Sequence, residues 1–277
     1  MKSIKCMTGK FLFSAVTSLL AASSFDVLAE DGGDLRAAVQ NPISSLVSLP
    51  FKFNFDYGAA NGDGTILNIQ PVYPITKGDW NYVSRLILPV ASVDGAISTP
   101  ENPNPSGFDS ASGLGDTNYS LFLSPVKYGD VIWGVGPSLM MPTATEDQLG
   151  SGKWSAGVTG VALTQPGWGT MGILGRHLWS FAGDDDRSDV NQTLIEPFAN
   201  YNLDNGWFLI TDLIITSNWE ASSGQQWTIP LGGGAGRIYK IGNQAVNNRI
   251  EFYYNVEKPD SAPDWTWAFT FQFLFPK

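Results

Sequence analysis

A single histidine and a single cysteine limit the chemistry open to this chain of 277 residues. A serine nucleophile needs a histidine beside it and a third group that orients the histidine. His177 is the one candidate, and it falls in phase with apolar Met171 and Trp179. No nearby serine shares that face, and an aspartate-based protease would also need a histidine among clustered acids. We therefore interpret His177 as an amphipathic side chain near the end of a strand, not as a catalytic base.

The densest group of acidic residues invites comparison with a calcium-binding loop. It comprises Asp184, Asp185, Asp186, Ser188 and Asp189. The EF-hand pattern fails here, because Arg187 interrupts it, no glycine stands at its turn position, and Ile195 stands where it places a bidentate glutamate. A solvated acidic loop is the better interpretation.

The glycine-rich run at 232–236 lacks the context of a dinucleotide-binding site, because Arg237 replaces the last glycine of the fingerprint and no helical pattern follows. One cysteine and one histidine also exclude a disulfide framework and most metal sites. A formal charge of −10, from 16 basic and 26 acidic residues, argues against the basic footprint that binds nucleic acid. We expect no cofactor, no bound metal, no nucleic-acid partner and no enzymatic activity.

The first 29 residues have the parts of a secretory signal peptide. Three lysines precede a mostly apolar run over 11–22, and the small or modest side chains of Val27 and Ala29 suit a cleavage site before Glu30. The apolar run is shorter than the roughly 20 residues that span a bilayer, so a short membrane anchor is the weaker alternative. The sequence therefore predicts export from the cytoplasm and a mature chain that begins at Glu30.

The rest of the chain shows the period-two alternation of apolar and polar residues that is typical of strands. In the last segment Trp267, Phe269 and Phe271 share one face. Ala268 and Thr270 share the other. Twelve such segments occur, at 48–57, 65–75, 80–90, 115–125, 131–143, 154–165, 169–180, 193–203, 207–216, 227–240, 245–256 and 265–276.

The connections between these segments alternate between short and long. The short ones, rich in turn residues, lie at 76–79, 126–130, 166–168, 204–206 and 241–244. The others, mostly longer, polar and acidic, lie at 58–64, 91–114, 144–153, 181–192, 217–226 and 257–264. An even-stranded antiparallel transmembrane barrel with short periplasmic turns and longer outer loops has this pattern. We predict such an all-β barrel, of about twelve strands, over residues 48–277.

A soluble β-sandwich also alternates, but its outward face usually carries many lysines and glutamates. Here only 15% of the residues are charged and 13% are aromatic. Tryptophans near the segment ends resemble the interfacial girdles of membrane barrels: Trp80, Trp133, Trp154, Trp179, Trp207, Trp227 and Trp265. A ten-residue strand tilted near 45° rises roughly 23 Å, close to the apolar band of about 25 Å in outer-membrane barrels. The pattern therefore favours a barrel in lipid.

The polar face of the segments would line the interior of such a barrel, and we place the functional site there. The lumen-lining candidates are Lys52, Asp56, Asn68, Gln70, Asn81, Arg85, Asp116, Asn118, Arg176, Glu196, Asn200, Asp212, Arg249, Glu251 and Gln272. Opposed charges, such as Arg85 with Asp116 and Arg249 with Glu251, suggest a network across the lumen. The alternative is that these charges only fill and stiffen the interior, as side chains do in small barrels.

Two points of the pattern stay open. Arg237 falls in phase with Trp227 and Leu231, on the face where an arginine at the bilayer midplane costs roughly 2–4 kcal/mol. Either a bulge near the glycines shifts the phase, or Arg237 lies close to the periplasmic rim. Residues 30–47 form an N-terminal periplasmic segment with an acidic start, and whether this segment plugs the barrel mouth is also open.

Several short motifs resemble those of one bacterial family. They lie in 41–54, beginning Asn41-Pro42-Ile43, and in Ile66-Leu67-Asn68-Ile69-Gln70-Pro71, Gly113-Leu114-Gly115-Asp116-Thr117-Asn118, Ile132-Trp133-Gly134-Val135-Gly136-Pro137, Leu149-Gly150-Ser151-Gly152-Lys153-Trp154, Trp179-Ser180-Phe181-Ala182-Gly183-Asp184-Asp185, Pro230-Leu231-Gly232-Gly233-Gly234 and Phe273-Leu274-Phe275-Pro276-Lys277. The chain thereby resembles, over nearly its whole mature length, the outer-membrane barrel family named after the meta-pathway of phenol degradation. Members are often labelled "transporter" and sometimes, misleadingly, "neuromedin U".

The resemblance implies a location in the outer membrane of a Gram-negative cell and uptake of hydrophobic or aromatic compounds. It carries over no catalytic or binding residues. The chain departs from barrel proteins generally because it ends on Phe275-Pro276-Lys277 rather than on a terminal aromatic. The aromatic ladder of the last segment can still serve the barrel-assembly machinery.

These features leave three candidate functions. The first is a passive outer-membrane channel or transporter for small molecules, hydrophobic or aromatic ones included. The second is a closed-lumen barrel, structural or engaged in surface interactions through its acidic outer loops. The third, an outer-membrane lipid enzyme, would depend on His177 and is not expected. The expected partners are outer-membrane lipid, lipopolysaccharide that divalent cations bridge to the acidic loops, the barrel-assembly machinery and an unidentified small-molecule cargo.

Overall fold

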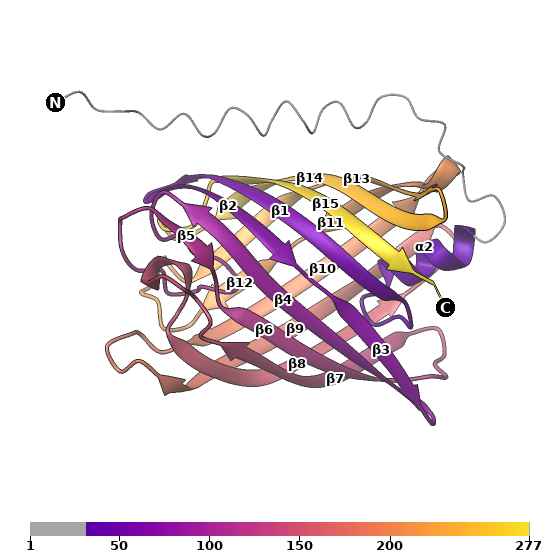
Figure 1. Cartoon of the computed structure of the whole chain (residues 1–277), viewed down its shortest axis with the longest axis horizontal. Coiled ribbons are helices and arrows are strands. Elements are labelled where there is room, and N and C mark those ends of the chain that lie inside the picture. Colours follow the sequence, from indigo (N-terminus) through magenta and orange to yellow (C-terminus); the bar gives the residue numbers. More distant parts are fainter. Residues whose placement is uncertain (1–31, 277) are drawn as a thin grey trace.

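The computed structural model describes residues 32–276, which form one β-sheet and a few short helical elements (Figure 1). The predicted signal peptide, residues 1–29, lies outside the described residues. Within them, no helix is both long and apolar enough to cross a membrane. The helical elements are α2 (Gly32–Gln40) and two single 3-10 turns, η1 (Asp147–Leu149) and η2 (Asp204–Gly206).

Fifteen strands make up the sheet. They are β1 (Val47–Ala59), β2 (Gly62–Ile69), β3 (Val72–Lys77), β4 (Trp80–Val93), β5 (Ala111–Leu114), β6 (Thr117–Pro125), β7 (Ile132–Met141), β8 (Lys153–Thr164), β9 (Gly169–Gly183), β10 (Asn191–Asn202), β11 (Trp207–Asp212), β12 (Ile215–Asn218), β13 (Trp227–Ile241), β14 (Gln244–Glu257) and β15 (Trp265–Phe275).

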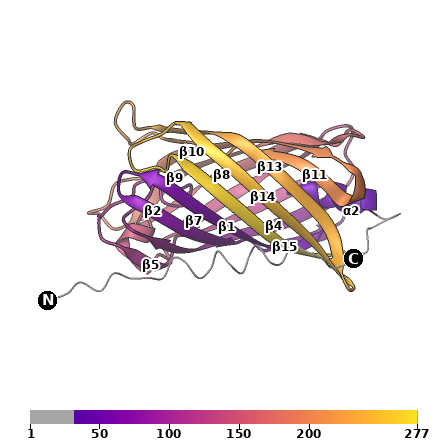
Figure 2. The ribbon, with the colours of Figure 1, turned by 90° about the horizontal axis from the view of Figure 1, so that it is seen from above.

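Twelve of these strands form a closed antiparallel ring. Strands that follow one another in the chain pair around it, and β1 pairs with β15, from Val47 opposite Phe275 to Tyr57 opposite Trp265, which closes it (Figure 2). Three further strands bond to members of the ring: β3 to β1 and β4, β5 to β4, and β12 to β10 and β13. The predicted fold class, an all-β antiparallel barrel of about twelve strands, is confirmed.

The alternation that predicted the strands also sets their faces. In β15, Ala268, Thr270 and Leu274 are buried, whereas Trp267 and Phe275 are exposed. Successive side chains of a strand point to opposite sides of the sheet, so a closed sheet sends every second one into the lumen. The polar and small residues of β15 therefore face inward and its aromatic residues face outward.

The two rims of the barrel differ in the length of their connections. The inner rim carries the turns 78–79, 126–131, 165–168, 203–206 and 242–243. The outer rim carries the connections 60–61, 94–110, 142–152, 184–190, 219–226 and 258–264. The tightest inner turns place Gly78 (φ 60°) and Gly242 (φ 59°) in the left-handed region that two-residue hairpins require.

One predicted connection is wrong in length. The stretch expected as a loop over 58–64 is a two-residue hairpin at 60–61, because β1 continues to Ala59 and β2 begins at Gly62. A bulge between Asp56 and Ala59 allows the ladder to continue that far.

The outward face of the ring is an apolar belt. Val158 in the middle of β8 is 61% exposed, Leu231 in β13 54% and Ile173 in β9 49%. Soluble monomers rarely expose a continuous apolar surface of this extent. The belt is what a barrel in lipid requires.

Aromatic pairs lie at both ends of the belt. Trp80 and Trp133 meet near the inner rim with ring centroids 6.2 Å apart, and Trp219 and Trp227 meet near the outer rim with centroids 5.7 Å apart. Tryptophan favours the boundary between hydrocarbon and headgroups, because one side of its ring is apolar and its N–H is polar. The two girdles therefore mark the two edges of the belt.

Apolar side chains also pack inside the barrel, and the N-terminal segment takes part in this packing. Ile43 is 2% exposed and packs in a cluster with Val83, Phe122, Ile132, Val161, Leu163, Leu174 and Leu194. Leu35, Ala38 and Val39 of α2 pack against a second cluster, formed by Leu46, Phe208, Ile210, Ile238, Ala245 and Leu274. Figure 1 shows α2 at the inner rim, in the mouth of the barrel.

Arg237 lies at the inner rim, which decides between the two alternatives for its register. The only shift in the β13–β14 ladder falls between Ile229 and Pro230, before the glycines. Arg237 Nε donates to the carbonyl oxygen of Asn205 at 3.2 Å, and its guanidinium lies 5.5 Å from the centre of the Trp207 ring. The charge therefore avoids the middle of the apolar belt.

The apolar belt predicts that a charged side chain on the outer face destabilises the folded barrel, and that the loss of stability grows with the depth of the charge in the bilayer. Val158→Arg should lower the free energy of unfolding from phosphatidylcholine vesicles by about 2–4 kcal/mol, because position 158 is mid-strand. Val131→Arg is the matched control, since Val131 is also exposed but lies in an inner turn, and it should cost only about 0–1 kcal/mol. Equal small costs at both positions in denaturant titrations would show that the belt faces water.

Candidate functional site

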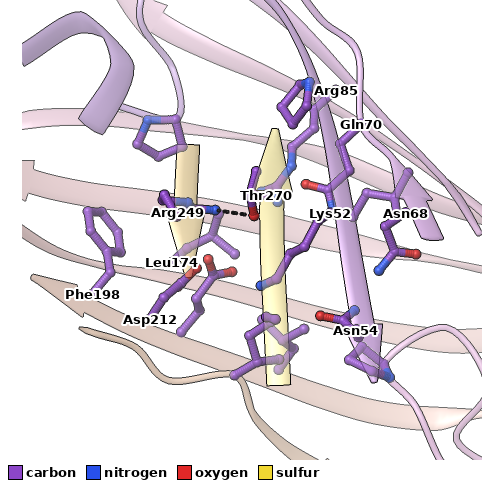
Figure 3. A pocket seen from close by; sticks show the side chains of 18 of the residues that line it. Lys52, Asn54, Asn68, Gln70, Arg85, Leu174, Phe198, Asp212, Arg249 and Thr270 are labelled. Atoms are coloured by element: carbon purple, nitrogen blue, oxygen red, sulfur yellow. Dashed lines mark hydrogen bonds between the residues drawn. The ribbon is translucent and has the colours of Figure 1, made fainter. Parts of the chain in front are cut away.

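A cavity of about 310 Å³ occupies the interior of the barrel (Figure 3). Its wall is formed by most strands of the ring, by residues 38–46 and by the outer loop 94–110. Twelve of the fifteen lumen candidates line it: Lys52, Asp56, Asn68, Gln70, Arg85, Asn118, Arg176, Glu196, Asn200, Asp212, Arg249 and Gln272. Strand alternation is the signal that places these side chains on the inward face.

The other three candidates do not line the cavity. Asn81 lies at the inner end of β4, where it accepts a hydrogen bond from Thr76 Oγ1 at 2.7 Å. Glu251 points inward but is covered, with only 1% of its surface exposed. Asp116 lies between β5 and β6 at the outer rim. Alternation reveals the face of a side chain, but not where a strand ends or which neighbour covers it.

Asp116 is a buried carboxylate that holds an outer loop. It accepts hydrogen bonds from Ser151 N at 2.7 Å, Ser151 Oγ at 2.8 Å and Ala144 N at 3.2 Å. Burial raises the pKa of Asp116 above its ordinary value, and the hydrogen bonds from Ser151 and Ala144 oppose that rise. The predicted pair with Arg85 is wrong, because β6 begins only at Thr117 and Asp116 turns toward loop 142–152.

Lys52, Thr270 and Arg249 form a row across three neighbouring strands (Figure 3). Thr270 of β15 stands between Lys52 of β1 and Arg249 of β14 in the two ladders. Arg249 forms the predicted ion pair with Glu251, with 3.5 Å between Nε and Oε2. The Tyr253 hydroxyl donates to Glu251 at 2.8 Å, so this buried carboxylate has two partners.

Two carboxyl groups face the lumen from β10 and β11. Glu196 and Asp212 lie within hydrogen-bonding reach of each other. Lys52 and Arg249 are the cations that act most strongly on Asp212. In all, four basic and four acidic side chains line the cavity, so its formal charges balance.

Apolar side chains line a further part of the cavity. They include Ile66, Ile87, Phe122, Leu174, Leu194, Phe198 and Ile214. Phe198 stands directly opposite Asp212 in the β10–β11 ladder, so apolar and charged surfaces adjoin. The cavity can therefore contact both the apolar body and the polar groups of one solute.

The N-terminal segment narrows the inner mouth of the cavity. Gln40 at the end of α2 donates from Nε2 to Asn202 Oδ1 at 2.9 Å and accepts from Thr170 Oγ1 at 2.9 Å. Gln165 Nε2 donates to the carbonyl oxygen of Ala37 at 2.7 Å. These bonds join the segment to the inner ends of β8, β9 and β10.

The longest outer loop, 94–110, folds back into the barrel. Its residue Glu101 is only 8% exposed and lines the cavity. Arg176 Nη2 donates to the carbonyl oxygen of Pro100 at 3.0 Å. Alternation missed Glu101, because the path of a loop does not follow a period. The one local signal in the sequence was the proline next to Glu101. A proline predicts a turn, but not the direction in which the turn points.

A second cavity of about 310 Å³ lies among the outer loops. Its lining is mostly neutral and polar, and includes Asn104, Ser106, Ser188, Gln192, Asn218, Gln225 and Gln226. Ser98, Thr216 and Thr228 line both cavities, so the two adjoin.

The barrel wall is interrupted between β11–β12 and β13. β11 pairs with β13 as far as Ile210 opposite Gly234, and pairing resumes at Thr216. In the described chain the stretch between has no ladder pairing, although Thr211 Oγ1 donates to the carbonyl oxygen of Gly232 at 2.9 Å. Main-chain groups in lipid need partners, and this stretch of the wall lacks the regular ladder that would supply them.

The two other candidates for chemistry lie away from the lumen. His177 is on the outer face of β9, where its Nδ1 is 2.7 Å from Thr193 Oγ1 and its ring centre is 4.0 Å from that of Trp179. Asp184 Oδ1 accepts from the main-chain N–H of Asp186 at 2.9 Å within loop 184–190. Among residues 32–276, no three His, Cys, Asp or Glu side chains form a group that could hold a metal ion.

The bonds to Asp116 predict a local effect of its removal. Asp116→Ala leaves the N–H groups of Ser151 and Ala144 without an acceptor, at a cost of about 1–3 kcal/mol. Hydrogen exchange at the Ser151 amide should then speed up by about tenfold or more. Asp147→Ala, which removes an exposed carboxylate from the same loop, should leave that rate unchanged. An unchanged rate in Asp116→Ala would contradict the role of Asp116.

Comparison with known proteins finds similarity in the fold. No protein-family model and no curated protein matches the chain. The crystal structure of an outer-membrane channel from Pseudomonas putida F1 has a TM-score of 0.60 at 15% identity, over 83% of this chain and 96% of that chain. The Pseudomonas putida toluene transporter TodX has a TM-score of 0.39 at 9% identity, over 91% and 94%. The first similarity shows that the chain has the fold of an outer-membrane β-barrel.

Proposed function

We propose that this protein is an outer-membrane channel that passively conducts small molecules, hydrophobic or aromatic ones included. The observation that carries the proposal is the adjoining pair of cavities, which extends from the outer loops to the N-terminal segment in the inner mouth. Small barrels without a transport role fill this space with packed side chains. The shared fold with a crystallised outer-membrane channel supports the same conclusion.

The amphipathic lining supports a cargo with an apolar body. Leu174 and Phe198 offer apolar contact, while Asp212 and Arg249 offer polar groups that can orient a solute. The interrupted wall lies beside Ile214, a lining residue, so an apolar molecule in the cavity is close to lipid there.

The proposed partners follow from the surfaces. Outer-membrane lipid would surround the apolar belt, and lipopolysaccharide would meet the acidic outer loops through divalent cations. The aromatic residues of β15 would be recognised by the barrel-assembly machinery, after export directed by the N-terminal signal. We propose no nucleic-acid partner and no enzymatic activity, since His177 lies on the outer face, away from the lumen.

A closed-lumen barrel that acts through its outer loops is the second candidate. The position of the N-terminal segment favours it, because α2 and Ile43 occupy the inner mouth and pack against the wall. The balanced charges of the lumen favour it as well, since paired charges can stiffen an interior without serving transport.

Reconstitution of the purified mature chain separates the two candidates. A conduit should give discrete single-channel currents in planar bilayers and solute flux into liposomes. A closed barrel should give neither, although it would still run as a folded, heat-modifiable species on gels. Silent bilayers from protein that passes this gel test, with loop 94–110 intact and also with it deleted, would contradict the proposed channel.

A tether tests whether the N-terminal segment must move. The predicted mature chain has no cysteine, because the one cysteine is Cys6. In Gln40→Cys/Asn202→Cys, a short bifunctional thiol reagent would fix the segment in the mouth, and conductance should fall and recover on cleavage of the tether. The control Thr76→Cys/Asn81→Cys tethers only the β3–β4 hairpin and should not respond. Equal conductance with and without the first tether would show that solutes pass beside a fixed segment.

A further inference from the structure

The inward-folded loop 94–110 is bonded to several other outer loops. Ser98 N donates to the carbonyl oxygen of Ser261 at 3.0 Å. Asn102 Nδ2 donates to the carbonyl oxygen of Gln148 at 2.9 Å. Because these acceptors belong to separate connections of the rim, the loop is held from more than one side. Its tip therefore has a defined position in the lumen.

A tight turn forms this tip. The main-chain N–H groups of Thr99 and Asn102 each donate to the other residue's carbonyl oxygen, at 3.1 Å in both directions. Pro100 occupies the second position of the turn, where the fixed φ of proline is favoured, and Glu101 occupies the third. The turn therefore sets the direction of the Glu101 side chain.

Glu101 is set among cations of the lumen. Burial raises the pKa of its carboxyl, and the positive charges of Arg176, Arg85 and Lys52 oppose that rise, with Arg176 the strongest. Arg176 also donates to the carbonyl oxygen of Pro100, so its guanidinium is fixed against the turn. The side chain of Arg85 makes no hydrogen bond or ion pair to another described residue, and it lines the cavity.

The turn stands where the two cavities meet. Thr99, Pro100 and Glu101 line the inner cavity, and Pro103 lines the outer one. Ser98, just before the turn, lines both. A solute that moves from the outer cavity to the lumen therefore passes beside the Glu101 carboxyl and the Arg176 guanidinium.

We infer that Glu101 and Arg176 form the charge filter of the barrel, and that Glu101 is the residue that limits the passage of small anions. This inference rests on the proposed channel function and specifies what the channel favours, namely neutral and cationic small molecules over anions. Without Glu101, the cavity lining would hold four basic and three acidic side chains, and Arg176 would lose the carboxylate that acts on it most strongly. In a narrow, low-dielectric passage such an excess of positive charge concentrates anions.

The test is the ion selectivity of single channels in a potassium chloride gradient at mildly alkaline pH. Glu101→Gln keeps the shape of the side chain and removes its charge. The ratio of potassium to chloride permeability should fall by about tenfold, the lower end of the range over which a one-signed cleft changes local ion concentration. Arg176→Gln should raise the ratio. Glu220→Gln, the same change on an exposed outer loop, should leave it unchanged.

The outcomes separate this inference from the proposed function. If wild type and Glu101→Gln conduct equally well and have the same permeability ratio, the charge filter is overturned and the proposed channel function stands. A silent wild type would overturn both. Heat-modifiable migration identifies folded protein before each recording. If Glu101→Gln does not fold, Arg176→Gln provides the test. A permeability ratio that does not rise in this variant would also overturn the charge filter.

Discussion

The pairing of β1 with β15 is the interaction on which the rest of the structure depends. Eleven residue pairs join the first and last strands and leave no free edge in the ring. In lipid no water is available to an unpaired main-chain group, so a sheet can cross only when its edges meet. Closure also fixes the faces of all strands at once. Lys52 and Thr270 come together inside the lumen, while Phe53 and Phe269 meet on the outer face.

The interior follows from this closure. Once aromatic and aliphatic residues face lipid, the remaining positions must hold the polar residues of the same strands, and their charges have to balance within a small volume. Arg249 pairs with Glu251, and the cavity lining holds as many acidic as basic side chains. The ends of the lumen are then shaped by segments outside the strands, namely the N-terminal segment at the inner rim and loop 94–110 at the outer rim.

Much of the fold could be predicted from the sequence, because a period of two requires only the types of successive residues. That period identified twelve strands and the inward faces of Lys52 and Arg249. It could not place Asp116 or Glu101, since both lie in connections whose paths depend on bonds to distant segments. Nor could it show that Glu251 is covered within the wall, which depends on side-chain packing between neighbouring strands. The parts that sequence missed are therefore those that close and narrow the lumen.

The central claim is that the lumen is a passage, and the accessibility of a single thiol tests it most directly. Asn54→Cys places the sole cysteine of the mature chain on the inward face of β1, in the lining of the cavity. We predict that a small, water-soluble methanethiosulfonate added from the outer side modifies this thiol in the folded protein and lowers single-channel conductance. A thiol that reacts only after unfolding, in bilayers that stay silent, would contradict the claim.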